Sequence, residues 1–305
     1  MRILISGSTG FLGSALVKAL QGQGHQIARL VRPGTRQGST DGTGRQDIAW
    51  DPVTGQFGAA AAEGAEALVH FAGASIADGR WNASRKELLR TSRIDATRHL
   101  IGALAKLQRP PRVIVAASAI GYYGSRGDEI LTEASAPGSD LLAGLCCDWE
   151  AETARGAEFG ARVVSLRFGI ILAAHGGALA KMAMPFKLGA GGRLGDGRQW
   201  MSWVTLPEVV SIVQFALATS ELAGPVNVVS PNPVRNSEFT TVLARTLHRP
   251  ALFPAPAFAL RLALGEMADA LLLASQRVIP SQLTDSGYRF QQPLLADAMA
   301  EVFRN

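Results

Sequence analysis

The chain has 305 residues, of which 47% are hydrophobic and 18% are charged. This composition supplies enough apolar material for a sizeable core and excludes a wholly disordered chain. The 30 Lys and Arg residues against 25 Asp and Glu give a net charge of +5. This mild excess contains no basic block of the kind that tracks phosphates, so we expect no nucleic-acid partner.

Two adjacent cysteines, Cys146 and Cys147, exclude a disulfide framework and a zinc site with four cysteine ligands. The five histidines are scattered, so no metal site is predicted. A strand that begins at residue 2 predicts that no signal peptide precedes the fold. Prolines and charged residues interrupt the apolar stretch 251–274, which is therefore too broken to span a bilayer. We expect a soluble, cytoplasmic protein with no membrane partner.

The first thirty residues predict a βαβ unit. Residues 2–5 form a short apolar run, a glycine-rich turn follows, and apolar residues with helical spacing lead to a second predicted strand at 25–31. The alternation continues with predicted strands at 67–71, 112–118, 161–167 and 226–229, and predicted helices at 81–107, 140–158 and 206–217. This order predicts an α/β fold, a Rossmann-type doubly wound parallel sheet.

After Ile170 the regular alternation of predicted strands and helices ends. Glycine-rich loops occupy residues 175–177 and 189–198, and the chain after Pro250 has the pattern of a small helical module. We therefore predict two domains: residues 1–235, with substrate loops near 175–200, and a smaller, mainly helical C-terminal lobe of residues 236–305.

The turn contains Gly7, Gly10 and Gly13 after a strand and before a helix. Glycine permits a tight turn, a close approach of the backbone to a pyrophosphate, and close packing of helix on strand. The N-terminus of the following helix attracts phosphate. The context favours a dinucleotide site over a purely structural turn.

The end of the second strand distinguishes the two nicotinamide cofactors. An acidic residue there would bind the ribose 2′-hydroxyl of NAD, whereas an arginine accommodates the 2′-phosphate of NADP. The chain has no acid at this point and carries Arg32, which we assign to the 2′-phosphate. Arg29 lies inside the strand and is interpreted as an edge charge. NADP(H) is therefore the predicted cofactor.

Several segments together resemble the extended short-chain dehydrogenase/reductase superfamily, in its NAD-dependent epimerase/dehydratase group. They are similar to an atypical, uncharacterised "epimerase family" clade with a C-terminal DUF1731 domain, and the resemblance covers nearly the whole chain. The segments are residues 5–13 (ISGSTGFLG), 71–81 (FAGASIADGRW), 92–94 (SRI), 118–124 (SAIGYYG), 148–150 (DWE) and 185–189 (PFKLG).

The resemblance implies positions for the rest of the cofactor site. Thr9, Phe11 and Leu12 would join the glycines at the pyrophosphate, and Asp51 falls where relatives contact the adenine. The residues implied on the ribose and nicotinamide side are Phe71, Ala72, Gly73, Arg93 and Ile171.

The departures from the family pattern concern catalysis. Typical members use a Tyr-x-x-x-Lys pair, in which the lysine and the cofactor lower the pKa of the tyrosine. If Glu150 aligns with the acid that follows this pair, Leu142 and Cys146 occupy the two places. Ala119 falls at the place of the substrate-polarising serine, with Ser118 one residue earlier, and Ala74 replaces a glutamate after Gly73.

Other residues are candidates for the missing chemistry. Ser118, Tyr122 and Tyr123 are the predicted catalytic residues, and the alternative for the tyrosines is an aromatic wall with locally bonded hydroxyls. Cys146 is either a reactive thiol or a buried, inert one. His175 is more simply a solvated loop residue. The loop of Asp196, Arg198 and Trp200 either binds a distal, anionic or planar group or is an exposed loop held by its glycines.

We therefore expect an NADP(H)-binding oxidoreductase or epimerase-like enzyme acting on an unidentified small molecule. The first alternative is a non-catalytic, NADPH-sensing regulatory protein, which the missing tyrosine–lysine pair favours. The second is a nucleotide-sugar binding module. Because many relatives dimerise through two helices beside the sheet, the resemblance also implies a homodimer.

Overall fold

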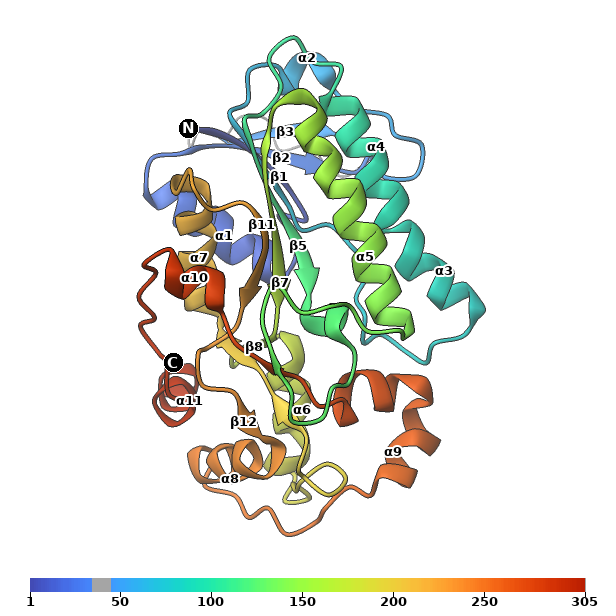
Figure 1. The fold of residues 1–305 in the computed structure, drawn as a ribbon, viewed down its shortest axis with the longest axis vertical. Helices are drawn as coiled ribbons and strands as arrows, with labels where there is room; N and C mark the ends of the chain where they lie inside the picture. Colours follow the sequence, from blue (N-terminus) through green and yellow to red (C-terminus); the bar gives the residue numbers. More distant parts are fainter. Residues whose placement is uncertain (35–44, 305) are drawn as a thin grey trace.

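The centre of the molecule is a seven-stranded sheet in which every pair of neighbours is parallel. The computed structural model describes residues 1–34 and 45–304 (Figure 1). The strand order β11-β7-β5-β4-β1-β2-β3 confirms the predicted doubly wound α/β fold. The strands are β1 (Arg2–Ser6), β2 (Gln26–Val31), β3 (Arg45–Ala49), β4 (Ala67–His70), β5 (Val113–Ala119), β7 (Arg162–Phe168) and β11 (Gly224–Val228).

The order in which the chain adds strands to the sheet reverses at β1. The chain runs outward from β1 through β2 to β3, then crosses back to β4 on the other side of β1 and continues outward to β11. A ligand of a doubly wound sheet binds outside the carboxyl ends of the strands at this switch point. The glycine turn, which follows β1, lies at this place.

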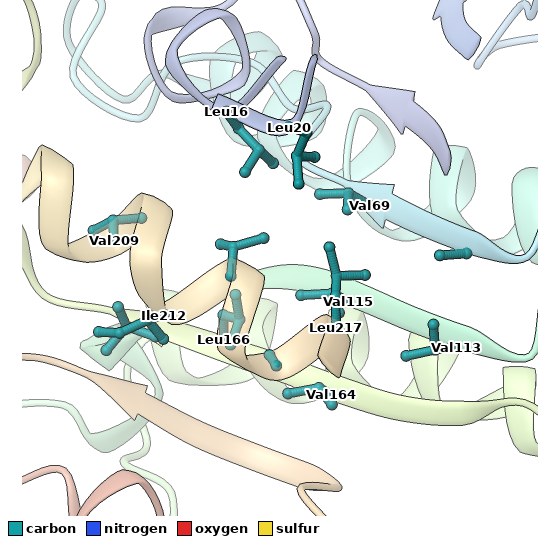
Figure 2. Close-up of a cluster of buried hydrophobic side chains, with 14 of the residues drawn as sticks. Leu16, Leu20, Val69, Val113, Val115, Val164, Leu166, Val209, Ile212 and Leu217 are labelled. Atoms are coloured by element: carbon teal, nitrogen blue, oxygen red, sulfur yellow. The ribbon is translucent and has the colours of Figure 1, made fainter. Parts of the chain in front are cut away.

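Helices cover both faces of the sheet, because its central strands β1, β4 and β5 have buried apolar residues on both sides. On one face lie α1 (Phe11–Gly22) and α7 (Leu206–Ala218), and on the other lie α3 (Ala83–Thr91), α4 (Ile94–Leu104) and α5 (Leu141–Ala154) (Figure 1). Figure 2 shows side chains of α1 and α7 pointing toward those of the strands. The labelled residues are Leu16, Leu20, Val209, Ile212 and Leu217 from the helices and Val69, Val113, Val115, Val164 and Leu166 from the sheet.

Two predicted helices differ from the structure. The continuous helix expected at 81–107 is broken into α3 and α4 at Ser92 and Arg93. The Ser92 hydroxyl donates to the Leu89 carbonyl at 3.3 Å and accepts the N–H of Ala74 at 3.1 Å, so a contact from outside the helix ends α3. The helix expected at 140–158 is α5 followed by a 3₁₀ turn, η2 (Arg155–Phe159).

Three short strand pairs and several helices build the remainder, in the lower half of Figure 1. The pairs are β8 (Ile170–Leu172) with β10 (Trp203–Thr205), β9 (Trp200–Met201) with β12 (Val234–Arg235), and β6 (Ile130–Leu131) with β13 (Arg277–Val278). The remaining helices are α2 (Ala59–Ala62), η1 (Ile120–Tyr123), α6 (Gly177–Lys187), α8 (Asn236–Thr246), α9 (Ala257–Leu264), η3 (Ala268–Leu273), α10 (Ser281–Asp285) and α11 (Leu295–Arg304).

The core of this lower part combines residues that are distant in the sequence. Leu172, Phe186 and Trp203 pack in one buried cluster with Phe239 and Leu295. The lobe therefore draws on residues from both sides of residue 235, and the domain boundary there stays a prediction. Among the described residues, no helix is both long and apolar enough to cross a membrane.

Candidate cofactor and substrate site

The glycine turn is built by close backbone contacts. Gly7 has φ 69°, and a Cβ there would lie 2.7 Å from the carbonyl carbon of Phe71. A Cβ on Gly13 would overlap the Gly7 carbonyl oxygen, which also accepts the N–H of Gly10 at 3.0 Å. Within the described chain no side chain caps the N-terminus of α1. Its free N–H groups can therefore bind a phosphate.

The arginines near the end of β2 have different roles. Arg29 forms a bidentate ion pair with Asp47, at 2.7 and 2.6 Å. The pair is largely buried and joins β2, which lies between β1 and β3, to the edge strand β3, so the interpretation of Arg29 as an edge charge was wrong. Arg32 is exposed directly after the strand. Asp51 lies nearby: N–H groups, first that of Val53, lower the pKa of its carboxyl, and the positive charge of Arg32 contributes to the same direction. The N–H of Trp50 donates to the Val31 carbonyl at 2.8 Å, so Arg32 and Asp51 follow neighbouring backbone positions.

A buried hydrogen-bond network fixes the loop after β4. The Ser6 hydroxyl lies 2.6 Å from Nδ1 of His70, whose Nε2 lies 2.9 Å from the Thr97 hydroxyl. Ser6 Oγ also accepts the N–H groups of Phe71 and Ala72 at 3.2 and 3.3 Å. Burial lowers the pKa of His70 to about 4, so this imidazole is neutral at pH 7. We did not predict this network from the sequence; the polar residue at the end of the buried 67–70 strand was its only local signal.

Arg93 supports the same loop from the break between α3 and α4. Its Nη2 donates to the Ala74 carbonyl at 2.9 Å, and its Cζ lies 5.2 Å from the centroid of the Trp149 ring. A Cβ on Gly73 would lie 3.5 Å from that Cζ, so the guanidinium lies directly against Gly73. Burial lowers the pKa of Arg93. The residue therefore lies at the predicted cofactor loop.

The Phe11 ring and the Ile171 backbone both lie close to the start of α6. A Cβ on Gly177 would lie 3.2 Å from the Phe11 ring and 3.6 Å from the Ile171 carbonyl oxygen, and one on Gly176 would lie 2.8 Å from the same ring. The start of α6 therefore packs on the ring that opens α1. The structure thus places the first turn of α1 and β8 on either side of the start of α6, and the cofactor contacts of Phe11 and Ile171 stay predictions.

Ser118 and Tyr123 do not fit the expected catalytic roles. Ser118 is 2% exposed and donates to Glu150 at 2.5 Å. Tyr123 is fully buried, donates to Asn227 at 2.7 Å and accepts from Arg167 at 3.0 Å. Burial raises the pKa of Tyr123 to about 12. Both hydroxyls are enclosed and bonded to protein, which for Tyr123 is the alternative of an aromatic wall.

Tyr122 differs from its neighbour. Its ring stacks on the Arg167 guanidinium, with the Cζ 3.4 Å from the ring centroid, and meets Tyr123 edge-on at 5.2 Å. The side chain is half-buried, and its hydroxyl makes no hydrogen bond to a described residue. Of the three predicted catalytic residues, only Tyr122 has a hydroxyl without a hydrogen bond to a described residue, and it does not line the pocket described below.

Leu142 and Cys146, the residues that the alignment of Glu150 would put at the places of the tyrosine and lysine, lie close to the end of β5. The Leu142 side chain lies 3.3 Å from the position that a Cβ on Gly121, just after β5, would occupy. Cys146 is buried, and burial raises the pKa of its thiol to about 12. The thiol is therefore protonated at neutral pH, which fits the inert alternative.

An open pocket of about 340 Å³ lies beside Leu142, where α3, the start of α5 and the C-terminal lobe meet. Lys86 and Glu266 form an ion pair of 2.5 Å between α3 and the lobe. The sequence could not predict this pocket because its walls are up to 193 positions apart (Trp81 and Ala274). The lining residues are Trp81, Lys86, Ser125, Asp140, Leu141, Leu142, Glu266, Asp269, Ala270 and Ala274.

The distal loop is held by stacking as well as by its glycines. The guanidinium carbons of Arg235 and Arg277 lie 4.2 and 4.4 Å from the centroid of the Trp200 ring, and Trp200 Nε1 donates to Asp128 at 2.9 Å. His175 is exposed. Across residues 1–34 and 45–304, no group of three His, Cys, Asp or Glu side chains could hold a metal ion.

Two family profiles match the chain. The "NAD dependent epimerase/dehydratase family" matches residues 3–229, and "Domain of unknown function (DUF1731)" matches residues 255–302. The "Epimerase family protein Mb2239" of Mycobacterium bovis is 40% identical over 297 residues, which cover 97% of this chain and 96% of that protein.

Solved structures agree with this match. The crystal structure of human epimerase family protein SDR39U1 (isoform 2) with NADPH has a TM-score of 0.88 and 31% identity over the whole of both chains. The nucleoside-diphosphate sugar epimerase from Corynebacterium glutamicum has a TM-score of 0.78 and 34% identity, and the match covers 98% of this chain and 57% of that one. The resemblance found in the sequence is confirmed, and the chain belongs to the NAD dependent epimerase/dehydratase family.

Proposed function

We propose that this chain is an NADP(H)-dependent oxidoreductase that acts on a small organic molecule. The uncapped N-terminus of α1 suits a pyrophosphate. Arg32 is exposed at the strand end where an arginine accommodates the 2′-phosphate. The human relative, 31% identical over its whole length, was crystallised with NADPH.

The residues at the switch point fit this cofactor, which supplies or accepts a hydride when bound. The glycine turn would hold the pyrophosphate, Arg32 the 2′-phosphate and Asp51 the adenine. The remaining residues that would line the cofactor are Thr9, Phe11, Leu12, Phe71, Ala72, Gly73, Arg93 and Ile171. The Ser6–His70 network would keep the β4 loop in position while the cofactor binds.

The pocket beside Leu142 is the observation that carries the proposal of an enzyme. One of its walls is Leu142, which packs against Gly121 just after β5, and its volume of about 340 Å³ is within the range of small-molecule sites. A ligand there would meet no Tyr-x-x-x-Lys pair. A proton for the reaction would come from Tyr122, from water or from the ligand itself.

A non-catalytic NADPH sensor is the second candidate. The enclosed hydroxyls of Ser118 and Tyr123 favour it, because neither group faces a ligand. In that case the pocket would bind an effector, or a partner protein would bind preferentially to the form of this chain that carries the cofactor. A homodimer remains a prediction for either candidate.

A pocket-filling variant distinguishes the two candidates. Ala270→Trp would fill the pocket without touching the glycine turn, and Ala154→Trp, at an exposed site on α5, is the matched control. For an enzyme, substrates found by loss of NADPH absorbance are turned over by the wild type and the control but not by Ala270→Trp, while all three bind NADPH equally. NADPH binding without turnover of any carbonyl, imine or nucleotide-sugar compound would favour the sensor.

A further inference from the structure

The pocket beside Leu142 is acidic. It is lined by the carboxylates of Asp140, Glu266 and Asp269 and by one ammonium group, that of Lys86. Lys86 is paired with Glu266 at 2.5 Å, and Asp269 is paired with Arg261 at 2.9 Å. Asp140 forms no ion pair with any described residue. An anionic ligand would therefore meet an uncompensated negative charge in this pocket.

Asp140 is held in a fixed position. It is the N-cap of α5, and its Oδ1 accepts the N–H of Ala143 at 2.9 Å. Its other oxygen, Oδ2, makes no hydrogen bond to a described residue. Asp140 is exposed, and Oδ2 lies close to Gly124 on one side. A carboxylate that is oriented by one oxygen and has no hydrogen-bond partner at the other can accept a hydrogen bond from a charged donor, which is stronger than a bond between neutral groups.

Apart from Ser125, the rest of the wall is apolar. Trp81 is fixed by donation from its Nε1 to the Ile76 carbonyl at 3.0 Å, and Leu141, Leu142 and Ala270 line the pocket with it. An aromatic ring beside a carboxylate recognises organic cations, because both the face of the ring and the carboxylate attract positive charge. The combination suits a ligand with an ammonium or iminium group on an apolar body.

The missing acid has a chemical consequence. Reduction of a ketone produces an alkoxide that needs a proton, and Leu142 and Cys146 hold the places of the groups that usually provide it. An iminium ion needs no such proton. Its carbon accepts the hydride, the electron pair of the C=N bond moves to nitrogen, and a neutral amine is released from the oxidised cofactor.

We propose that this pocket binds apolar organic cations and that the chain reduces iminium ions to amines with NADPH. The inference rests on the proposed function, since it takes the hydride from the cofactor assigned there. It adds the class of substrate and assigns Asp140 and Trp81 as the residues that bind the cation.

A binding titration tests the charge preference without turnover. The probes are 2-phenylethylamine, 2-phenylethanol and phenylacetate, which share the apolar body and differ in charge, together with UDP-glucose. NADP⁺-saturated protein is expected to bind the amine more tightly than the alcohol and not to bind phenylacetate. Higher salt should weaken binding of the amine alone.

The variant Asp140→Asn isolates the charge, because asparagine is as good an N-cap as aspartate. It is expected to weaken binding of the amine about tenfold and to leave binding of the alcohol unchanged. Asp285→Asn, which removes the same charge from an exposed position outside the pocket, is expected to change neither. Tighter binding of phenylacetate or UDP-glucose than of the amine, or an unchanged amine affinity in Asp140→Asn, would overturn the inference.

A matched pair of substrates tests the reaction. The cyclic imine 3,4-dihydroisoquinoline is expected to consume NADPH, and the ketone acetophenone is expected not to. Faster reduction of the ketone would contradict the proposed chemistry. If the protein binds NADPH but not the amine, this inference alone is overturned. If it binds the amine but not NADPH, the proposed function is overturned, and the proposed reduction with it.

Discussion

The close packing of the glycine turn on α1 is possible because Gly13 has no side chain. An alanine there would drive its Cβ into the carbonyl oxygen of Gly7 and push α1 away from β1. We predict that Gly13→Ala lowers the free energy of unfolding by about 2 kcal/mol and weakens NADPH binding at least about tenfold. Urea unfolding and NADPH titration measure the two effects.

Gly22 is the matched control in the same helix. It lies at the exposed C-terminal end of α1, and nothing lies within 4 Å of the position its Cβ would take. Gly22→Ala should keep the wild-type NADPH affinity and raise stability by about 0.5 kcal/mol. Equal behaviour of the two variants would refute the steric explanation.

His70 makes a prediction about pH. Its folded pKa of about 4 lies below the ordinary 6.5, so the unfolded chain binds the proton more tightly than the folded one. The contribution of His70 to the free energy of unfolding is therefore fully present above pH 6.5. It is lost as the pH falls toward 4, which lowers the free energy of unfolding by up to about 3 kcal/mol. Observation of the His70 ring by NMR should show titration near pH 4; a midpoint near 6.5 would contradict the buried network.

At the residue scale, the places of residues in the fold were predicted correctly where the signal was local in the sequence, while their cofactor contacts stay predictions. Gly7, Gly10 and Gly13 lie within one turn, and Arg32 follows the next strand, so the βαβ pattern identifies them together. The network of Ser6 and His70 involves partners up to 91 positions further along the chain (Thr97), and no short motif marks it. Ser118 lies at the end of the predicted strand and Tyr123 follows it, as expected, but burial of their hydroxyls depends on Arg167 and Glu150, which only the fold brings there.

At the scale of elements, the cap of α5 can be separated from its charge. The Asp140 carboxylate accepts the N–H of Ala143. Asp140→Ala removes this bond and is expected to lower the free energy of unfolding by about 1 kcal/mol, whereas Asp140→Asn should stay within about 0.3 kcal/mol of the wild type. Chemical unfolding of the three proteins provides the measurement. A loss in Asp140→Asn as large as in Asp140→Ala would show that the charge, and not the cap, stabilises the helix.

Most elements were predicted because their apolar patterns are strong. The buried strands around β1, β4, β5 and β7 are short apolar runs bounded by turn residues. The break between α3 and α4 escaped the pattern because Ser92 bonds to Ala74, a contact outside the helix. β3 was also missed: its sequence, RQDIA, is mostly polar, and it is a strand because it pairs with β2 at the edge of the sheet.

At the scale of the whole molecule, Glu208 joins the C-terminal segment to α7. The side chain is 3% exposed and accepts the Tyr288 hydroxyl at 2.5 Å and the N–H groups of Gln291 and Gln292 at 2.9 and 3.1 Å. Glu208→Ala would leave these donors without a partner. It should lower the free energy of unfolding, measured with urea, by about 3 kcal/mol. Glu238→Ala, on α8, is the control and should be nearly neutral; a small effect of Glu208→Ala would mean that the segment is held by apolar packing instead.

The lobe shows the limit of prediction from the sequence at this scale. Its helical character after residue 250 was predicted and agrees with α9, α10 and α11. Its core, however, also takes Leu172 and Trp203 from segments that precede it by more than thirty residues. The pocket between α3, the start of α5 and the lobe also depends on long-range packing, which no pattern along the chain indicates.

The relative affinity for NADPH and NADH tests the central claim most directly. Arg32 is expected to bind the 2′-phosphate, the group that distinguishes the two cofactors. The wild type should therefore bind NADPH at least about tenfold more tightly than NADH, and Arg32→Ala should lose this preference while it keeps its affinity for NADH. Equal affinity of the wild type for the two cofactors, or a preference that survives in Arg32→Ala, would contradict the account.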